Sequence, residues 1–418
     1  MLRNYICALD ISSSKVSAAV AEVKKRHITN IFFETQIPSK GIRKGAIVNS
    51  IDLTGSIGRT LKNLKAKSGI NIKFIYTNIS GFDIVTKHSR AIIPLAERGN
   101  KVITLSDIQQ ANEQARILGS SLEEETIHQI AQNYAIDSNS NILNPLGLYS
   151  HRLEVDLYLI SAKSSFMHGL SRAVNQAGYE IRDLFLSGLA TSEAVFNKEL
   201  KEGVTVLCDI GSDITELLLF SDGILKDVRI LTVGGNDLTI QLEEKLKIAF
   251  ALAEDVKISY GSVGDYNQTH NDKEILIKQN NAYKPINQRS VSEILTSKSK
   301  LICQTIKDSM GKIVSFDEVD NFVTTGRTVL LEGFLEMLEN NLGISVKLGR
   351  ITNPNITAWV NKDNTISGQR YLTYVTSLGI ICQALYQPQP KTISAHQPTQ
   401  NPILNTINKF KELYQEYF

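Results

Sequence analysis

Short apolar runs alternate with polar turns along most of the chain, and their spacing predicts its elements. Apolar residues three or four positions apart mark helices, and short runs rich in β-branched residues mark strands. The predicted helices are 51–68, 107–118, 123–131, 165–177, 188–200, 237–246, 251–260, 291–312, 329–342 and 375–385. The predicted strands are 5–9, 16–23, 28–37, 74–80, 83–94, 153–162, 181–187, 204–208, 214–220, 274–278, 322–325 and 346–348. Helices and strands mixed along the whole chain are typical of an α/β fold.

One unit of this pattern, a strand, a short polar turn and a second strand, occurs twice. The first copy spans residues 5–23 and the second spans residues 204–220. In both copies the first strand ends on an aspartate, which begins the motif DISS at 10–13 and DIGS at 209–212. A repeated unit of this kind predicts a chain with two related halves.

The composition of the two turns is suited to phosphate. Small residues let backbone N–H groups approach phosphate oxygens, hydroxyl and ammonium groups add donors, and an aspartate suits a phosphate-bound Mg²⁺ through water. For either turn alone the alternative is an ordinary acidic hairpin turn, and one copy in each half favours phosphate binding. The candidate phosphate-binding residues are Asp10, Ser12, Ser13, Ser14, Lys15, Asp209, Gly211 and Ser212, with Asp10 and Asp209 as candidate Mg²⁺ ligands through water.

Two predicted helices in the second half provide further candidate ligand-binding residues. Gly234, Gly235 and Asn236 precede the first of them, and a helix N-terminus after a glycine-rich turn favours anions. On the next helix Glu254 and Lys257 lie three positions apart and therefore on one face.

Residues 82–162 are predicted to form an inserted subdomain. Ser106 is the predicted N-cap of the helix at 107–118, with an acidic residue directly after it. A polar loop at 139–148, with Pro145 and Gly147, precedes the last strand of this subdomain.

Composition narrows the class of protein. A length of 418 residues predicts two or more domains, and a net charge of +2 gives no electrostatic case for nucleic acid. The four cysteines are far apart and match no metal-binding spacing, so they are expected to be the reduced thiols of a cytosolic protein. No apolar run is long enough to span a bilayer, and a strand that begins near residue 5 argues against a signal peptide.

The last part of the chain has a different composition. Four of the nine prolines fall within 387–402, which is predicted to be a flexible linker. Residues 403–418 then form an amphipathic pattern that is predicted to be a membrane-binding helix. Its apolar residues are Ile403, Leu404, Ile407, Phe410, Leu413, Tyr414, Tyr417 and Phe418. The alternative is a disordered tail or a helix that packs on its own domain.

The order of these parts resembles the FtsA family of bacterial cell division proteins, within the actin-like superfamily. Residues 10–15 and 209–215 resemble its two phosphate loops, 234–236 its connecting loop, the helix with Glu254 and Lys257 its adenosine-contacting helix, and 325–328, with Gly326 and Arg327, its adenosine loop. The sequences NYAID at 133–137 and NPLGL at 144–148 resemble the inserted subdomain of this family. The amphipathic tail resembles its membrane-targeting sequence. The resemblance covers essentially the whole chain.

The resemblance implies an actin-like two-lobed fold of two ribonuclease-H-like domains, with an SHS2-like insert and a C-terminal amphipathic helix. The implied first lobe is 1–81 with 163–200, the insert is 82–162, the second lobe is 201–233 with 308–386, and the lower subdomain of the second lobe is 234–307.

The resemblance also implies a function. Members bind ATP with Mg²⁺, assemble into actin-like filaments, anchor the FtsZ ring at the cytoplasmic face of the inner membrane and recruit later division proteins. The implied site for the C-terminal peptide of FtsZ lies in the lower subdomain, with Arg289, Lys298 and Lys300 as the candidate basic residues. The alternative for each of them is a solvated charge. ATPase activity is expected to be weak at most.

The chain departs from the family pattern at several positions. Ser12 and Asp213 stand in the phosphate loops where small residues, usually glycine in the first, are typical, and Arg327 and Thr328 follow Gly326 in place of further glycines. Arg327 is a candidate for stacking on adenine. The tail lacks tryptophan and a basic excess. Two other functions remain open, a pilus-assembly scaffold of the same superfamily and, with less support, a small-molecule kinase.

Overall fold

The computed structural model describes residues 4–36, 38–96, 99–137, 139–264, 273–279, 282–360 and 368–386. The predicted linker at 387–402 and the predicted membrane helix at 403–418 lie outside these residues.

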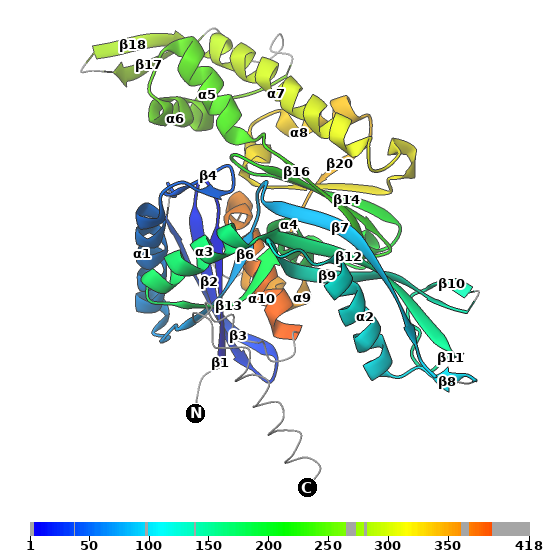
Figure 1. Cartoon of the computed structure of the whole chain (residues 1–418). Coiled ribbons are helices and arrows are strands. Elements are labelled where there is room, and N and C mark those ends of the chain that lie inside the picture. Colours follow the sequence, from blue (N-terminus) through cyan, green and yellow to red (C-terminus); the bar gives the residue numbers. More distant parts are fainter. Residues whose placement is uncertain are drawn as a thin grey trace.

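The first lobe is built on a five-stranded sheet with the order β13-β6-β1-β2-β3 (Figure 1). Its strands are β1 (Asn4–Ile11), β2 (Val16–Lys24), β3 (His27–Gln36), β6 (Phe74–Ile79) and β13 (Glu180–Leu186). Helices α1 (Ser50–Ser68) and α3 (Ser164–Gln176) cover one face. Cys7 and Leu9 of β1 pack in the cluster below these helices, whereas Ile6 and Ala8 face the cluster on the other side. Because both faces are covered, β1 is an almost continuous apolar run.

The second lobe repeats this arrangement in a sheet with the order β16-β15-β14-β19-β20. Its strands are β14 (Val204–Ile210), β15 (Thr215–Ser221), β16 (Ile224–Leu231), β19 (Asn321–Thr325) and β20 (Val346–Leu348). In each lobe the first strand pairs antiparallel with the second strand of the hairpin and parallel with a later strand. The strands are connected in the same way in both lobes, which confirms the two related halves that the repeated hairpin predicts.

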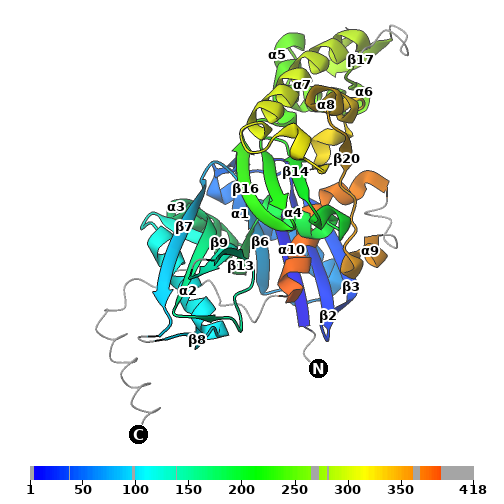
Figure 2. The ribbon, with the colours of Figure 1, turned by 90° about the vertical axis from the view of Figure 1, so that its right-hand side faces the viewer.

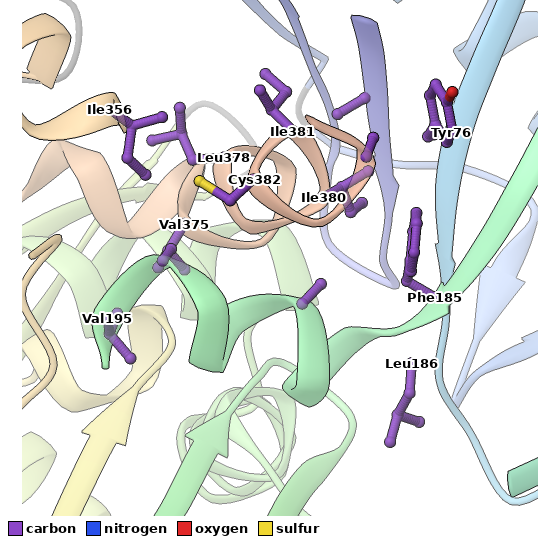
Figure 3. Packing of buried hydrophobic residues seen from close by; sticks show 14 of the residues in the cluster. Tyr76, Phe185, Leu186, Val195, Ile356, Val375, Leu378, Ile380, Ile381 and Cys382 are labelled. Carbon is purple, nitrogen blue, oxygen red and sulfur yellow. The ribbon is translucent and has the colours of Figure 1, made fainter. Parts of the chain in front are cut away.

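Two helices connect the lobes, α4 (Ser187–Val195) and α10 (Val375–Tyr386). Figure 3 shows Val195 of α4 together with Val375, Leu378, Ile381 and Cys382 of α10 in one apolar cluster. This cluster also contains residues of both sheets, so the two lobes share a core.

The insert is a separate layer with its own core. Its sheet has the order β10-β9-β12-β7, and α2 packs against it on one face (Figure 2). The elements are β7 (Ile84–Pro94), β8 (Lys101–Val102), α2 (Leu105–Gly119), β9 (Glu124–Ile136), β10 (Asn139–Ile142), β11 (Tyr149–Ser150) and β12 (Arg152–Lys163). The insert also bonds the second lobe, since Gln132 Nε2 donates to Leu225 O at 2.9 Å and Val228 N donates to Tyr158 Oη at 3.0 Å.

The remaining elements belong mainly to the second half, where α5, α6, α7 and the β17–β18 ribbon lie together at the top of Figure 1, in the segment predicted as the lower subdomain of the second lobe. They are α5 (Gly235–Leu246), α6 (Phe250–Tyr260), β17 (Glu274–Gln279), β18 (Ala282–Asn287), α7 (Gln288–Met310), α8 (Phe334–Leu342), α9 (Pro354–Val360) and the short 3₁₀ helices Glu199–Lys201, Phe316–Glu318, Arg327–Leu330 and Gly368–Thr373. In the first lobe β4 (Ile42–Arg43) and β5 (Ala46–Ile47) pair antiparallel in a short ribbon.

Several local predictions were wrong. The predicted helix at 123–131 is the first part of strand β9. The N-cap of α2 is Thr104 and not Ser106, because Thr104 and Asp107 form a capping box in which each side chain bonds the backbone N–H of the other. The predicted helix at 188–200 ends at Val195, where Phe196 turns extended and is buried.

The predicted helix at 329–342 is also interrupted. Gly333 adopts φ +79°, and a Cβ there would lie 2.0 Å from the carbonyl oxygen of Val263. The chain therefore leaves the helical path so that Val263 N donates to Glu332 O at 2.8 Å, and α8 begins at Phe334.

His128 on β9 is expected to make the protein sensitive to mild acid. Its Nε2 accepts a hydrogen bond from Leu186 N at 2.9 Å, which requires a neutral ring, and burial lowers the pKa of His128 to about 4. Between pH 6.5, the ordinary pKa of histidine, and pH 4, the unfolded chain therefore binds a proton at His128 and the folded protein does not. The free energy of unfolding consequently falls as the pH falls toward 4. Since part of the side chain remains accessible, we expect a loss of about 1 kcal/mol between pH 7 and pH 5.

Urea unfolding of the His128→Gln variant at both pH values measures this loss, because the amide oxygen of glutamine accepts the same bond and does not titrate. The exposed His27→Gln variant is the control and should keep the wild-type pH dependence. An unchanged acid sensitivity in His128→Gln would contradict the assignment.

Candidate functional site

The site is a cavity of about 500 Å³ between the two lobes. This volume is in the range of small-molecule sites in proteins. The predicted nucleotide-binding residues that line it are Asp10, Ser12, Ser13, Ser14, Lys15, Asp209, Gly211, Ser212, Gly235, Asn236, Glu254, Lys257, Gly326 and Arg327. Gly234 is the exception. It packs beneath the second turn, where a Cβ would lie 2.6 Å from the carbonyl oxygens of Gly211 and Ser212.

The two predicted phosphate turns have the same local structure. In the first, Ser12 N donates to Lys15 O at 3.0 Å, and in the second Gly211 N donates to Ile214 O at 2.9 Å. Each turn therefore closes a hairpin and exposes its middle residues to the cavity. Ser14 of the first turn corresponds to Asp213 of the second.

Asp10 is held in a buried network. It pairs with the Lys15 ammonium group, and its Oδ1 accepts from Asn78 Nδ2 at 2.9 Å. Asn78 Nδ2 also donates to Ser187 Oγ at 2.8 Å. Lys15 and Asp10 thus largely neutralise each other, which leaves the first turn with little net charge to offer a phosphate.

Asp209, at the end of β14, is the less engaged of the two aspartates. Burial raises the pKa of Asp209 to about 6. Among the described residues no group of three or more His, Cys, Asp or Glu side chains is arranged to hold a metal ion. Asp10 and Asp209 line the same cavity, and a Mg²⁺ that arrives with a phosphate would be bound by them through water.

The N-terminus of α5 is occupied by the second turn. Gly235 N donates to Gly211 O at 3.0 Å and Asn236 N donates to Ser212 O at 2.7 Å. These N–H groups fix the turn in place and are not free for an anion. The expected anion contact of this helix start is thus indirect.

Glu254 and Lys257 on α6 form an ion pair with each other. Lys257 Nζ donates to Glu254 Oε2 at 2.6 Å, to Thr239 Oγ1 at 2.7 Å and to Gly235 O at 3.0 Å. Burial lowers the pKa of Lys257. The pair is therefore rigid and lies beside the start of α5, at the side of the cavity that Arg327 borders.

Arg327 reaches the opposite lobe. Its Nη2 donates to Ser14 Oγ at 3.0 Å, and burial lowers the pKa of its guanidinium group. The expectation that it stacks on adenine remains a prediction, since its observed partner is the first phosphate turn.

The sequence did not lead us to predict Glu216 as a residue of this cavity. Glu216 lies directly opposite Asp209 in the hairpin, is buried and lines the cavity. Its Oε2 accepts from Gly188 N at 2.5 Å, and Oε1 has no hydrogen-bond partner among the described residues. Burial raises the pKa of Glu216 to about 8. The signal was available, because a single acidic residue interrupts the apolar strand β15.

The three predicted partner-binding residues do not gather on one face. Arg289, Lys298 and Lys300 all lie on α7, where Arg289 and Lys300 are exposed and Lys298 is half-buried. At 100° per residue, Arg289 and Lys300 project on the same side and Lys298 on the opposite side. Arg289 Nε also donates to Glu293 Oε1 at 3.1 Å.

Comparison of the sequence with known protein families identifies the relatives of this chain. Residues 206–377 match the family model "Cell division protein FtsA". Residues 81–161, which hold the inserted layer, match "SHS2 domain inserted in FTSA". The chain belongs to the FtsA family. It is thus a cell division protein with an actin-like fold and an SHS2 insert.

Individual relatives agree with this FtsA assignment. The cell division protein FtsA of Borreliella burgdorferi is 26% identical over 353 residues, which cover 84% of this chain and 85% of that protein. Among solved structures, the PilM-PilN type IV pilus biogenesis complex matches with a TM-score of 0.62 and 15% identity over 92% of this chain and 100% of that chain. MreB5 of Spiroplasma citri bound to ADP matches with a TM-score of 0.51 and 12% identity over 86% and 96%.

Proposed function

We propose that this FtsA family member is a division adaptor that binds an adenine nucleotide and holds FtsZ at the cytoplasmic face of the membrane. The observation that carries the proposal is the match of residues 81–161 to the model "SHS2 domain inserted in FTSA", in a chain whose residues 206–377 match the FtsA family model. Assembly into filaments and recruitment of later division proteins belong to the same proposal.

Adenine nucleotide binding is supported by the cleft. The two turns, the Glu254–Lys257 pair and Gly326 with Arg327 surround one cavity. The similar MreB5 structure was solved with ADP. When bound, Mg²⁺ would neutralise phosphate charge near Asp10 and Asp209. The residues of this chain would hold the phosphates with backbone N–H and hydroxyl groups and the nucleoside between the two lobes.

For the FtsZ peptide we propose helix α7 as the docking element. Arg289 and Lys300 offer two cations about 16 Å apart on one side of the helix, which suits an extended acidic peptide along its length. Lys298 lies on the other side and is a weaker candidate.

For the membrane we propose residues 403–418 as the anchor. None of the helices in the described residues is long and apolar enough to cross a bilayer. The sequence pattern of the tail instead suits a helix that lies in the lipid interface, so we propose a peripheral protein at the inner membrane of the division site.

Liposome sedimentation tests the adaptor. We expect the full chain to sediment with lipid and to carry FtsZ with it, whereas a chain that ends at Gln400 stays in solution. Phe410→Glu, on the predicted apolar face, should abolish sedimentation, and the matched control Gln415→Glu, on the predicted polar face, should not. A truncated chain that sediments as well as the full chain would contradict the membrane role.

A pilus-type scaffold is the second candidate, because the PilM-PilN complex has the same fold over 92% of this chain. Such a scaffold binds a peptide of a membrane partner and needs no lipid-binding tail. Failure to bind a peptide with the C-terminal sequence of FtsZ, together with failure to sediment, would favour it. A small-molecule kinase has less support, since the elements described leave no additional substrate domain.

A further inference from the structure

Two side-chain contacts cross the mouth of the cleft from equivalent positions of the two turns. Ser14, in the first lobe, accepts a hydrogen bond from Arg327 of the second lobe at 3.0 Å. Asp213, in the second lobe, accepts one from the backbone N–H of Lys44 of the first lobe at 2.8 Å. Asp213 and Arg327 are also two of the positions at which these loops depart from their usual composition. Both departures therefore take part in bonds between the two lobes.

Asp213 is fully engaged by N–H donors. Its Oδ2 accepts from Lys44 N, and its Oδ1 accepts from Asn236 Nδ2 at 2.7 Å. The residue is 7% exposed and lines the cavity next to Gly211 and Ser212. A terminal phosphate bound by both lobes would need N–H donors from each lobe, such as Lys44 N and Asn236 Nδ2. Here a carboxylate of the protein already holds them.

Two of the cations that line the cavity are bonded to residues other than Asp213. Lys15 pairs with Asp10, and Arg327 bonds Ser14. Over the part of the chain that the structure describes, no basic side chain lies within ion-pair distance of Asp213. A terminal phosphate brought to this turn would meet the negative charge of Asp213 in a largely buried place, where repulsion is stronger than in water.

We propose that Asp213 occupies the position of a terminal phosphate and makes the cleft select nucleoside diphosphates over triphosphates. The inference rests on the proposed binding of an adenine nucleotide and specifies which one. It also explains why the lobes are joined across the cleft by side chains of the protein itself. The other residues of both turns line the cavity and are left for the α- and β-phosphates.

The test compares the affinities of the full chain for ADP and ATP, each with Mg²⁺, by isothermal titration calorimetry. Wild type is expected to bind ADP more tightly by at least about tenfold. Asp213→Asn removes the charge and keeps one acceptor, and Asp213→Gly restores a small residue. Both are expected to raise ATP affinity by about tenfold or more and to leave ADP affinity within about threefold. The control Asp222→Asn, in the turn at the far end of β15, should keep the wild-type ratio.

The outcomes separate the two claims. If wild type binds ATP as tightly as ADP, or if Asp213→Asn binds ADP normally and gains no ATP affinity, the selectivity of Asp213 is refuted and nucleotide binding stands. If wild type binds neither nucleotide, the proposed binding itself fails. ADP titration also reports whether each variant is folded, and if Asp213→Gly does not fold, Asp213→Asn decides.

Discussion

Substitution of Gly379 by valine is expected to destabilise the whole protein. Gly379 lies on α10 where this helix crosses α4, and a Cβ at this position would lie 1.8 Å from the carbonyl oxygen of Ala190. The obstacle is backbone inside a helix, so it does not move aside as a flexible side chain does. Both helices belong to the core shared by the two lobes (Figure 3). We expect the free energy of unfolding to fall by at least about 3 kcal/mol.

Urea unfolding followed by circular dichroism measures this loss. The matched control is Gly58→Ala, another glycine within a helix, where the nearest atom to a new Cβ is the Ala177 Cβ at 4.0 Å. Since alanine favours helix and meets no obstacle there, the control should be neutral or more stable by about 0.5–1 kcal/mol. A Gly379→Val variant as stable as wild type would mean that α4 and α10 do not approach as closely as the structure has them.

Substitution of Glu216 by glutamine is expected to stabilise the protein at neutral and alkaline pH. Burial raises the pKa of Glu216 from its ordinary value of 4.5 to about 8, so the folded state keeps a proton that the unfolded chain releases. Wild-type stability is therefore lost as the pH rises from about 4.5 to about 8. Glutamine is neutral throughout, and its amide oxygen still accepts from Gly188 N. We expect a gain of about 3 kcal/mol at pH 7 and about 4 kcal/mol at pH 8.

Unfolding midpoints at pH 5, 7 and 8 distinguish this effect from a general change in packing. The advantage of Glu216→Gln should be small at pH 5 and grow with pH. The control Glu244→Gln removes an exposed carboxylate of α5 and should not change the pH dependence. A variant that is less stable than wild type at pH 8 would show that Glu216 is ionised and paired in the folded protein.

Several elements were predictable because their signals are local. Helix α1 has an apolar face, an N-cap at Asn49 and a left-handed Gly69 at its end, and the prediction of 51–68 misses its start by one residue. The hairpins β1–β2 and β14–β15 combine apolar strands with a short polar turn, and their repetition was sufficient to predict two lobes. Such features depend on neighbouring residues and are therefore present in the sequence alone.

Strand β9 shows where this reasoning fails. Ile127, Ile130 and Tyr134 have the spacing of a helix face, yet the segment pairs with β12 over most of its length. The register shifts between Asp156 and Leu157 and again between Ile160 and Ser161, so the apolar residues of β9 do not alternate strictly. Irregular pairing with a distant strand removes the period of two on which strand prediction depends.

The sequence by itself determined the α/β class, the two related halves, the insert and the residue types that line the cleft, because each rests on local patterns or on a repeat. The tertiary structure decided how those residues are used. Arg327 bonds Ser14, and Asp213 bonds Lys44 across the cleft. The two partners of each bond come from opposite lobes, and only the packing of the lobes fixes which of these side chains and N–H groups meet.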